Sequence, residues 1–191
     1  MNGETVLETK RLILRKWRPD DLDPFTAMNV DPEVMRFFPS RPDRAETEAQ
    51  IRLVSDNIER HGIGWWAIEI PGNFDFAGFA GLSRPRFHTH FTPCVEIGWR
   101  LRRDAWGKGY ATEAGSACLD FAFDRLKLDD IVSMAVVDNH RSRAVMERLG
   151  MTRRKEDDFG HPNIGIDHPL RAHVLYRLSR QVWLEKRKAL A

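Results

Sequence analysis

Segments with the hydrophobic spacing of helices alternate along the chain with short segments that have the pattern of strands. Residues 11–15 predict a first strand, and residues 18–28 predict a helix that opens with a proline and acidic residues. Residues 31–33 repeat that start signal. Residues 43–60 carry hydrophobic side chains every three or four positions, which predicts a longer helix. The first third of the chain therefore predicts one strand followed by helices.

The middle of the chain has the pattern of a small antiparallel sheet. Residues 65–70, 76–83 and 95–101 are short, rich in aromatic and branched side chains, and separated by Pro, Gly and Asn. They predict a three-stranded meander. Trp65 and Trp66 are neighbours on a strand and should point to opposite faces, so we expect one of them in the core and the other near the acceptor.

The last third returns to alternating helices and strands. Residues 112–126 predict a helix, and residues 131–137 are a nearly continuous apolar strand, which is typical of a strand covered on both faces. Residues 139–149 predict an amphipathic helix that Gly150 ends in the left-handed conformation.

The C-terminal segment predicts two final strands, a loop and a helical tail. The strands are expected at residues 151–155 and 173–179, with a loop over 157–168 that is rich in Gly, Pro, Asp and His. We find no repeat and no linker. The sequence therefore predicts one α/β domain over residues 1–191, with its core at about 8–179 and a helical tail at about 180–191.

Composition places the chain among ordinary globular proteins. Its 191 residues suffice for one domain, with 42% hydrophobic and 30% charged residues. A formal net charge of +2 gives little support to a nucleic-acid-binding module. The basic patch of such a module would be Arg141, Arg143, Arg148, Arg153 and Arg154. No aromatic residues interleave with these arginines, so we expect no nucleic-acid partner.

Cysteines and histidines give no sign of a disulfide framework or a metal site. Cys94 and Cys118 lack the spacing of a zinc site, and a reducing cytoplasm is the expected location. Residues 1–9 have no hydrophobic core of a signal peptide, and no apolar run approaches the ~20 residues of a membrane span. His88 and His90 could be a metal pair or loop polarity, and we favour loop polarity because no third ligand accompanies them. The C-terminal histidines likewise predict no metal; they are His161, His168 and His173.

The clearest chemical signal is a strand, a glycine turn and a helix in succession. The strand is residues 95–101, the turn is Trp106-Gly107-Lys108-Gly109-Tyr110-Ala111, and Thr112 and Glu113 open the helix. Glycines let consecutive N–H groups converge, and the helix start adds unpaired donors, so the turn is suited to a pyrophosphate. A Gly-x-Gly turn alone is weak evidence, and neither a nucleoside-triphosphate loop nor a dinucleotide fingerprint is present.

Three blocks together resemble the GNAT superfamily of N-acetyltransferases, and specifically its ribosomal-protein N-acetyltransferase-like branch. The first is residues 8–15, and the second runs from Glu96-Ile97-Gly98-Trp99-Arg100-Leu101 into the glycine turn and Ala114. The third is Asn139-x-x-Ser142, which ends at Leu149-Gly150. The resemblance covers nearly the whole chain. It implies a GNAT fold, with a mixed, mostly antiparallel central sheet that is flanked by helices and splayed between the fourth and fifth strands.

The resemblance also implies the residues that bind acetyl-CoA. The pantetheine arm would lie along the fourth strand, at Trp99, Arg100 and Leu101. The pyrophosphate would bind the backbone of Gly107, Lys108, Gly109, Tyr110, Ala111 and Thr112. Asn139 and Ser142 would line the thioester side, although both are also the residues that a helix needs to cap its first turn.

Two positions depart from the family pattern. Trp106 stands where the family commonly has glutamine or arginine, and Met146 stands where a tyrosine often protonates the leaving thiolate. Methionine cannot donate a proton, so the general acid stays open, with Tyr110 and Tyr176 as candidates.

The sequence thus predicts direct acetyl transfer from acetyl-CoA to a primary amine in a ternary complex, without a metal. Glu96, acting through water, is the expected base, although a strand glutamate is more often only a solvated side chain. A non-catalytic acyl-CoA sensor with the same fold is the alternative. The acceptor could be a protein N-terminus, a free amino acid or a small amine, and a homodimer is compatible with the sequence.

Overall fold

The computed structural model describes residues 4–190, so residues 1–3 and 191 of the predicted 1–191 domain lie outside it. Its contacts divide the chain into two compact units. The first unit holds the chain up to Ser83 together with Gly98–Cys118. The second holds Arg84–Ile97 and the chain from Leu119 onward. In both units the sheet is mostly antiparallel and flanked by helices, as predicted.

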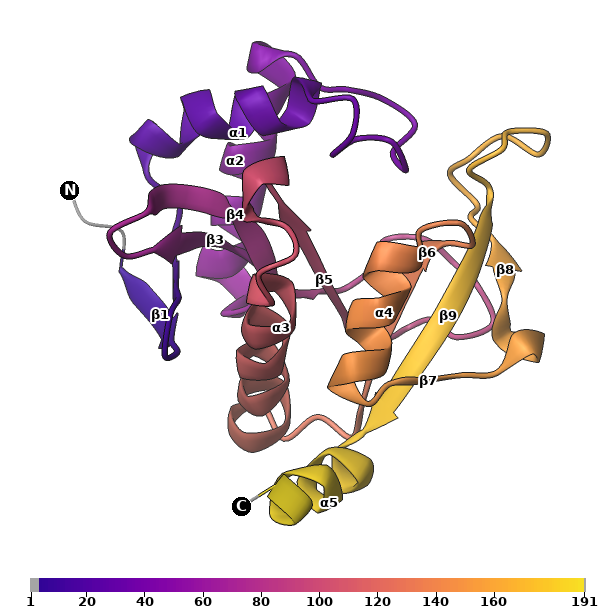
Figure 1. Ribbon diagram of the computed structural model, residues 1–191. Helices are drawn as coiled ribbons and strands as arrows, with labels where there is room; N and C mark the ends of the chain where they lie inside the picture. Colours follow the sequence, from indigo (N-terminus) through magenta and orange to yellow (C-terminus); the bar gives the residue numbers. More distant parts are fainter. Residues whose placement is uncertain (1–3, 191) are drawn as a thin grey trace. The chain divides into compact units, whose positions relative to one another are not determined.

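The sheet of the first unit contains five strands in chain order. They are β1 (Thr5–Glu8), β2 (Ile13–Arg15), β3 (Trp65–Ile70), β4 (Phe74–Ser83) and the end of β5 (Glu96–Leu101). The pairs from β1 to β4 are antiparallel (Figure 1). As expected, Trp66 lies in the core and is fully buried, whereas Trp65 is half-buried. The sequence did not predict β1, which has no fully buried residue.

In the first unit, α1 (Leu22–Val30) packs on β4 and α2 (Arg44–His61) packs on α1. The short 3-10 helix η1 (Pro19–Asp21) leads into α1, whose Phe25 and Met28 pack into one hydrophobic cluster with Phe76 and Phe79. The second helix, α2, begins with a capping box. Asp43 accepts a hydrogen bond from the Glu46 N–H, and the Glu46 side chain accepts one from the Asp43 N–H.

The helix start expected at residues 31–33 is wrong. Asp31 Oδ1 accepts a hydrogen bond from the Glu33 N–H at 2.8 Å, and the following residues form turns. The side chain of Asp31 therefore closes a local turn, and Pro39 and Pro42 prevent a helix from continuing toward α2.

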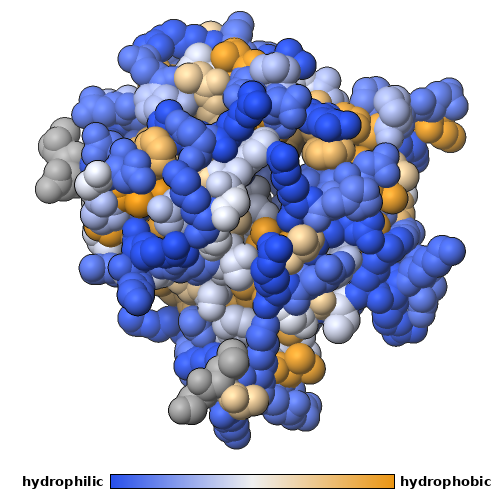
Figure 2. All heavy atoms as spheres, in the orientation of Figure 1, coloured by the Kyte–Doolittle hydropathy of each residue, from blue (hydrophilic) through white to orange (hydrophobic). Residues whose placement is uncertain are grey.

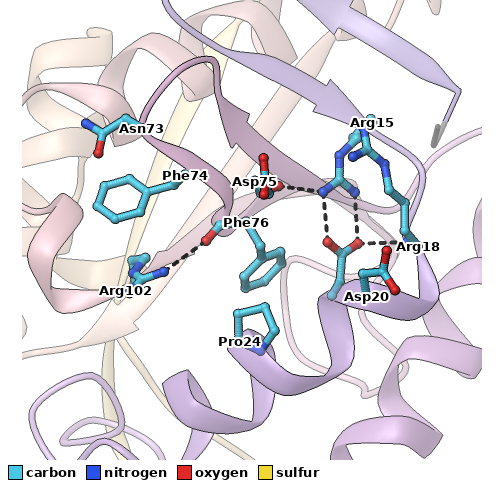
Figure 3. Close-up of a pocket in the computed structure, with 10 residues that line it drawn as sticks. Arg15, Arg18, Asp20, Pro24, Asn73, Phe74, Asp75, Phe76 and Arg102 are labelled. Atoms are coloured by element: carbon cyan, nitrogen blue, oxygen red, sulfur yellow. Dashed lines mark hydrogen bonds and ion pairs between the residues drawn. The ribbon is translucent and has the colours of Figure 1, made fainter. Parts of the chain in front are cut away.

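A buried ion pair joins β2 to η1 in the first unit. Arg15, which is 1% exposed, makes two 2.8 Å hydrogen bonds to the Asp21 carboxylate and one of 3.0 Å to Glu69. Burial lowers the pKa of the Arg15 guanidinium, but Asp21 and Glu69 outweigh burial, so its pKa lies above the ordinary value. Figure 3 shows this pair in the wall of a cavity of about 340 Å³. Each nitrogen of the Arg15 guanidinium therefore donates a hydrogen bond within the fold.

The helix expected at residues 112–126 begins earlier and ends differently. α3 (Tyr110–Asp120) starts directly after the glycine turn and continues as a π-helical segment, η3 (Phe121–Arg125). A short 3-10 helix, η2 (Arg103–Ala105), links β5 to that turn.

In the second unit, β6 (Asp130–Val136) and β9 (Ala172–Ser179) form the longest ladder. They pair antiparallel from Asp130–Ser179 to Val136–His173. The start of β5 runs parallel to β6, with Glu96 opposite Val132. The splay between these two strands stays a prediction. Two short strands also pair with β9: β7 (Thr152–Arg153) and β8 (Phe159–Gly160). β8 interrupts the region expected to be entirely loop, and the 3-10 helix η4 (Lys155–Asp157) precedes it.

Helices of the second unit follow the sequence prediction closely. α4 (His140–Leu149) is capped by Asn139, packs on β6, and ends at Gly150 with φ 89°. α5 (Arg180–Leu190) follows β9 directly (Figure 1). Trp183 of α5 donates a hydrogen bond of 3.0 Å to Asp120 Oδ1. Leu149 and Trp183 are both buried, so each helix is fixed by its apolar face.

Figure 2 shows hydrophilic residues over most of one face, with hydrophobic residues in small separate groups. None of the described helices combines the length and apolar composition needed to cross a membrane.

Aromatic rings and two histidines form a cluster on the loops and strands around β8 and β9. The His161 and His173 ring centroids lie 5.0 Å apart, and Phe87 and Phe159 pack against His161 at 4.8 and 6.2 Å. Burial lowers the pKa of both imidazoles, and the charges of His173 and Arg171 lower that of His161 further. The His173 Nδ1–Arg171 carbonyl contact only partly offsets this effect for His173.

This cluster should make the stability of the protein depend on pH. Both folded-state pKa values lie below that of an unfolded histidine, about 6.5. As pH falls below 6.5, the unfolded chain takes up protons first, so the free energy of unfolding should decrease. We expect the His161→Phe/His173→Phe double variant to show a smaller decrease between pH 7 and 5 in urea unfolding. The exposed His88→Gln is the control; an unchanged pH dependence in the double variant would contradict the prediction.

Candidate functional site

The glycine turn before α3 has the geometry of an anion-binding loop. Gly107 and Gly109 have φ of 73° and 82°, a left-handed conformation that favours glycine. A Cβ at Gly107 would meet no atom within 4 Å, and one at Gly109 would meet only Arg11 Nη2, at 3.4 Å. α3 begins at Tyr110, so the first N–H groups of the helix have no acceptor within it. The loop thus presents backbone donors beside open space.

Residues from the β1–β2 turn hold this loop in place. The Glu113 carboxylate accepts hydrogen bonds from the Thr9 hydroxyl at 2.7 Å and from Arg11 Nε at 2.6 Å. Arg11 Nη1 donates to the Lys108 carbonyl at 3.0 Å, and its guanidinium lies 4.7 Å from the centre of the Tyr110 ring. Arg11 therefore links the loop backbone to the first turn of α3.

The charge of Glu113 strengthens this arrangement. Burial raises the pKa of the Glu113 carboxyl, but the hydrogen bonds from Thr9 and Arg11 and the Arg11 charge outweigh burial, so its pKa lies below the ordinary value. A cavity of about 520 Å³ lies next to this network, with Lys10, Arg11 and Tyr110 in its wall. Positive charge thus borders the loop on one side.

Trp106, at the head of the motif, has a structural contact. Its indole Nε1 donates to the Leu101 carbonyl at 2.9 Å, and the ring packs against the core cluster of the first unit. The residue therefore ties the glycine loop to the end of β5.

The β5 residues predicted to hold the pantetheine differ in their surroundings. The Leu101 carbonyl already accepts the Trp106 hydrogen bond, so a ligand bond to that oxygen would have to share it. Trp99 and Arg100 are half-buried. Trp65 lies against Gly98, because a Cβ added there would be 3.1 Å from the indole Cη2. Their role toward the coenzyme stays a prediction.

Asn139 and Ser142 cap α4 in the second unit. Asn139 Oδ1 accepts a hydrogen bond of 3.2 Å from the Ser142 N–H. This is the capping role that the sequence left open beside ligand binding. Their contact with the coenzyme stays a prediction.

Glu96 lies at the start of β5, in the second unit, and is half-buried. Ser133 fixes the next residue of the strand by donating a 2.9 Å hydrogen bond to the Ile97 carbonyl. Burial raises the pKa of the nearby Cys94 thiol to about 11, and the charges of Glu96 and Asp130 add to this shift. Cys118 is buried, which also raises the pKa of its thiol. Neither thiol is therefore a ready nucleophile at neutral pH.

The two tyrosines considered as proton donors are buried, and so is the methionine that stands where the family often has a tyrosine. Met146 is 0% exposed, in the core of the second unit. Tyr176 donates its phenolic hydrogen to Glu147 Oε1 at 2.8 Å, and the Tyr110 ring lies under Arg11. The hydroxyl of Tyr176 is thus already engaged with a carboxylate.

Within residues 4–190, no group of three or more His, Cys, Asp or Glu side chains is arranged to hold a metal ion. His90 instead lies 3.6 Å from Asp157, and His161 and His173 belong to the aromatic cluster described above.

Sequence reasoning missed the clamp of Thr9, Arg11 and Glu113. Thr9 and Arg11 lie about a hundred positions before Glu113 in the chain, so no local pattern joins them to it. The only local signal was an acidic residue in the first turn of a helix, which is common at any helix start. It also missed the side-chain surroundings of Arg100, which was predicted only as a backbone contact.

Comparison with known proteins places the chain in a family. Residues 11–152 match the acetyltransferase (GNAT) domain. The chain is 27% identical over 198 residues to FsC-acetyl coenzyme A-N(2)-transacetylase of Aspergillus fumigatus, covering 98% of this chain and 82% of that protein. It is 34% identical over 89 residues, 47% of each chain, to the ribosomal N-acetyltransferase-like protein YdaF of Bacillus subtilis.

The fold agrees with these relatives. An acetyltransferase from Agrobacterium tumefaciens superposes with a TM-score of 0.71 and 27% identity, covering 93% of this chain and 95% of that one. The resemblance to GNAT proteins and to their ribosomal-protein N-acetyltransferase-like members is thereby confirmed. The chain is a member of the GNAT family of acetyltransferases.

Proposed function

We propose that this protein transfers the acetyl group of acetyl-CoA to a primary amine by direct attack in a ternary complex. The observation that carries the proposal is the glycine loop at the start of α3, where Gly107 and Gly109 are left-handed and bordered by open space. Convergent N–H groups at a helix start bind phosphate groups. Use of acetyl-CoA is a general property of the family to which the chain belongs.

The proposed contacts to the coenzyme follow the three segments already named. The backbone from Gly107 to Thr112 binds the pyrophosphate, and Trp99, Arg100 and Leu101 bind the pantetheine arm. Asn139 and Ser142 line the thioester side. Lys10, Arg11 and Lys108 add positive charge near the loop, which favours an anionic ligand.

The reaction forms one bond and breaks one. The neutral amine nitrogen attacks the carbonyl carbon of the thioester, the carbon–sulfur bond breaks, and coenzyme A leaves as a thiolate that is then protonated. Glu96 takes the amine proton through water, and a backbone N–H near Trp99 stabilises the oxyanion. The raised pKa of Cys94 and Cys118 disfavours an acetyl-cysteine intermediate.

The proposed location is a reducing cytoplasm, which suits two free cysteines. The alternative function, a non-catalytic acyl-CoA sensor, would use the same loop to bind the coenzyme. The two functions differ in turnover alone.

A thiol-release assay tests the proposal. The purified protein is mixed with acetyl-CoA and with panels of peptides, amino acids, polyamines and aminoglycosides, and mass spectrometry identifies the acetylated product. We expect acceptor-dependent release of coenzyme A. Tight coenzyme A binding with no release above the acceptor-free rate in any panel would favour the sensor.

A further inference from the structure

Arg100 of β5 is a half-buried cation whose neighbours are neutral. Its Nη1 donates to Asn29 Oδ1 at 2.6 Å and lies 3.3 Å from Met35 Sδ. Its guanidinium carbon is 4.2 Å from the centre of the Phe38 ring and 5.0 Å from that of Phe79. No carboxylate pairs with Arg100 among the residues that the structure describes.

One edge of this guanidinium is unused, and it has the two parallel donors that a carboxylate can bind. Nε is buried without a hydrogen-bond partner, and the Nε–Nη2 edge makes no hydrogen bond within the described part of the chain. A carboxylate binds arginine through two parallel N–H donors of such an edge. Phe38, which is 38% exposed, lies over the guanidinium, so the group is just below the surface.

Arg15, in the same unit, is a buried arginine with a structural role, and carboxylates balance the charge of its guanidinium. Its charge is balanced by two hydrogen bonds to Asp21 and one to Glu69. The neighbours of Arg100 are instead an amide carbonyl, a thioether sulfur and aromatic rings. A buried charge without a counterion is unfavourable. The absence of a carboxylate beside Arg100 therefore points to a ligand that supplies one.

Asn29 cannot supply the missing charge, and its orientation is fixed. Its Nδ2 donates to Thr47 Oγ1 at 3.0 Å, and the residue is fully buried between α1 and α2. Its Oδ1 therefore faces Arg100. Burial lowers the pKa of Arg100 to about 10, so the guanidinium still carries its charge at neutral pH.

We propose that Arg100 binds a carboxylate of the acceptor, so that the acceptor is an amine bearing a carboxylate. This inference rests on the proposed acetyl transfer, because Arg100 lies on the β5 segment that we assign to the pantetheine arm. The carboxylate could belong to a free amino acid or to an acidic side chain near the N-terminus of a peptide. Arg100 would thus determine which amines are acetylated.

Matched acceptors separate these two sources. One arm compares free L-amino acids with their C-terminal amides, and the other compares amidated tripeptides with Asp or Glu at the second position with the Asn or Gln counterparts. We expect kcat/KM to be about 100-fold higher for the carboxylate member in one arm. Equal kcat/KM within every pair would overturn the inference and leave acetyl transfer intact. Absence of turnover in all arms would refute both.

Two variants test Arg100 itself. Arg100→Gln should abolish the preference for the carboxylate acceptor over its amide, which lowers the ratio of the two kcat/KM values by about 100-fold. Asn29→Asp would give Arg100 an internal counterion and should also abolish the preference for the carboxylate. Asn29→Asp keeps the size of the side chain, so this variant can test the inference if Arg100→Gln fails to fold. Arg52→Gln removes an exposed charge from α2 and is the control. A preserved preference in both folded variants would overturn the inference.

Discussion

Coenzyme A binding should weaken by about 100-fold or more when Gly109 is replaced by valine. Gly109 has φ 82°, which a branched side chain adopts only with strain. The new side chain would also enter the space that we assign to the pyrophosphate, because the only neighbour of a Cβ there is Arg11 Nη2 at 3.4 Å. Isothermal titration calorimetry with coenzyme A measures the change.

The control for Gly109→Val is Gly62→Val. Gly62 follows α2 with φ 68°, and a Cβ there would meet no atom within 4 Å. The two substitutions therefore impose a similar backbone strain, and we expect both to lower the melting temperature. Only Gly109→Val should affect coenzyme A. Equal affinity in a folded Gly109→Val variant would remove the glycine loop from the proposed site.

Local signals in the sequence were enough to predict helix ends and the turn before α3. Asp43 and Glu46 form the capping box that starts α2, and Gly150 ends α4 with positive φ. Two glycines before an amphipathic run were enough to predict the turn before α3. In each case the residue type acts on its own backbone or on the next turn, so a local pattern contains the information.

The elements that were missed depend on partners far away in the chain. β1 and β8 are short and have exposed or half-buried residues, and each forms because a neighbouring strand offers an unpaired edge. The false helix start at Asp31 had the right residues but closed a turn instead. Sequence pattern cannot distinguish these outcomes, because the deciding contact is tertiary or the competing hydrogen bond is equally local.

The candidate site likewise contains features that the local sequence predicts and features that depend on residues far away in the chain. Its backbone donors were predicted from glycines, whereas the clamp of Arg11 on Glu113 and the neutral surroundings of Arg100 could be recognised only in three dimensions. An arginine on a strand is normally a solvated side chain. Arg100 has no carboxylate nearby among the described residues, and for this reason we interpret it as a binding residue. Its neighbours are set by the packing of α1 and α2, which the sequence pattern does not reveal.

Glu96 is the remaining assignment with a large expected effect. It is half-buried at the start of β5, opposite Val132, and the hydrogen bond from Ser133 to the Ile97 carbonyl fixes the adjacent backbone. An attacking amine must first lose a proton, and an α-amino group with a pKa near 8 is mostly protonated at pH 7. A fixed carboxylate that accepts this proton through water would therefore contribute most near neutral pH.

Glu96→Gln should lower kcat/KM by about 100-fold at pH 7, with coenzyme A affinity nearly unchanged. The deficit should shrink as pH rises above 8, because an α-amine is then already neutral and needs no base. Rates measured from pH 6.5 to 9.5 give both results. Asp130→Asn removes another charge that acts on Cys94 and should leave the profile unchanged. If Glu96→Gln has wild-type kinetics at pH 7, Glu96 is a structural strand residue, and water or another carboxylate accepts the proton.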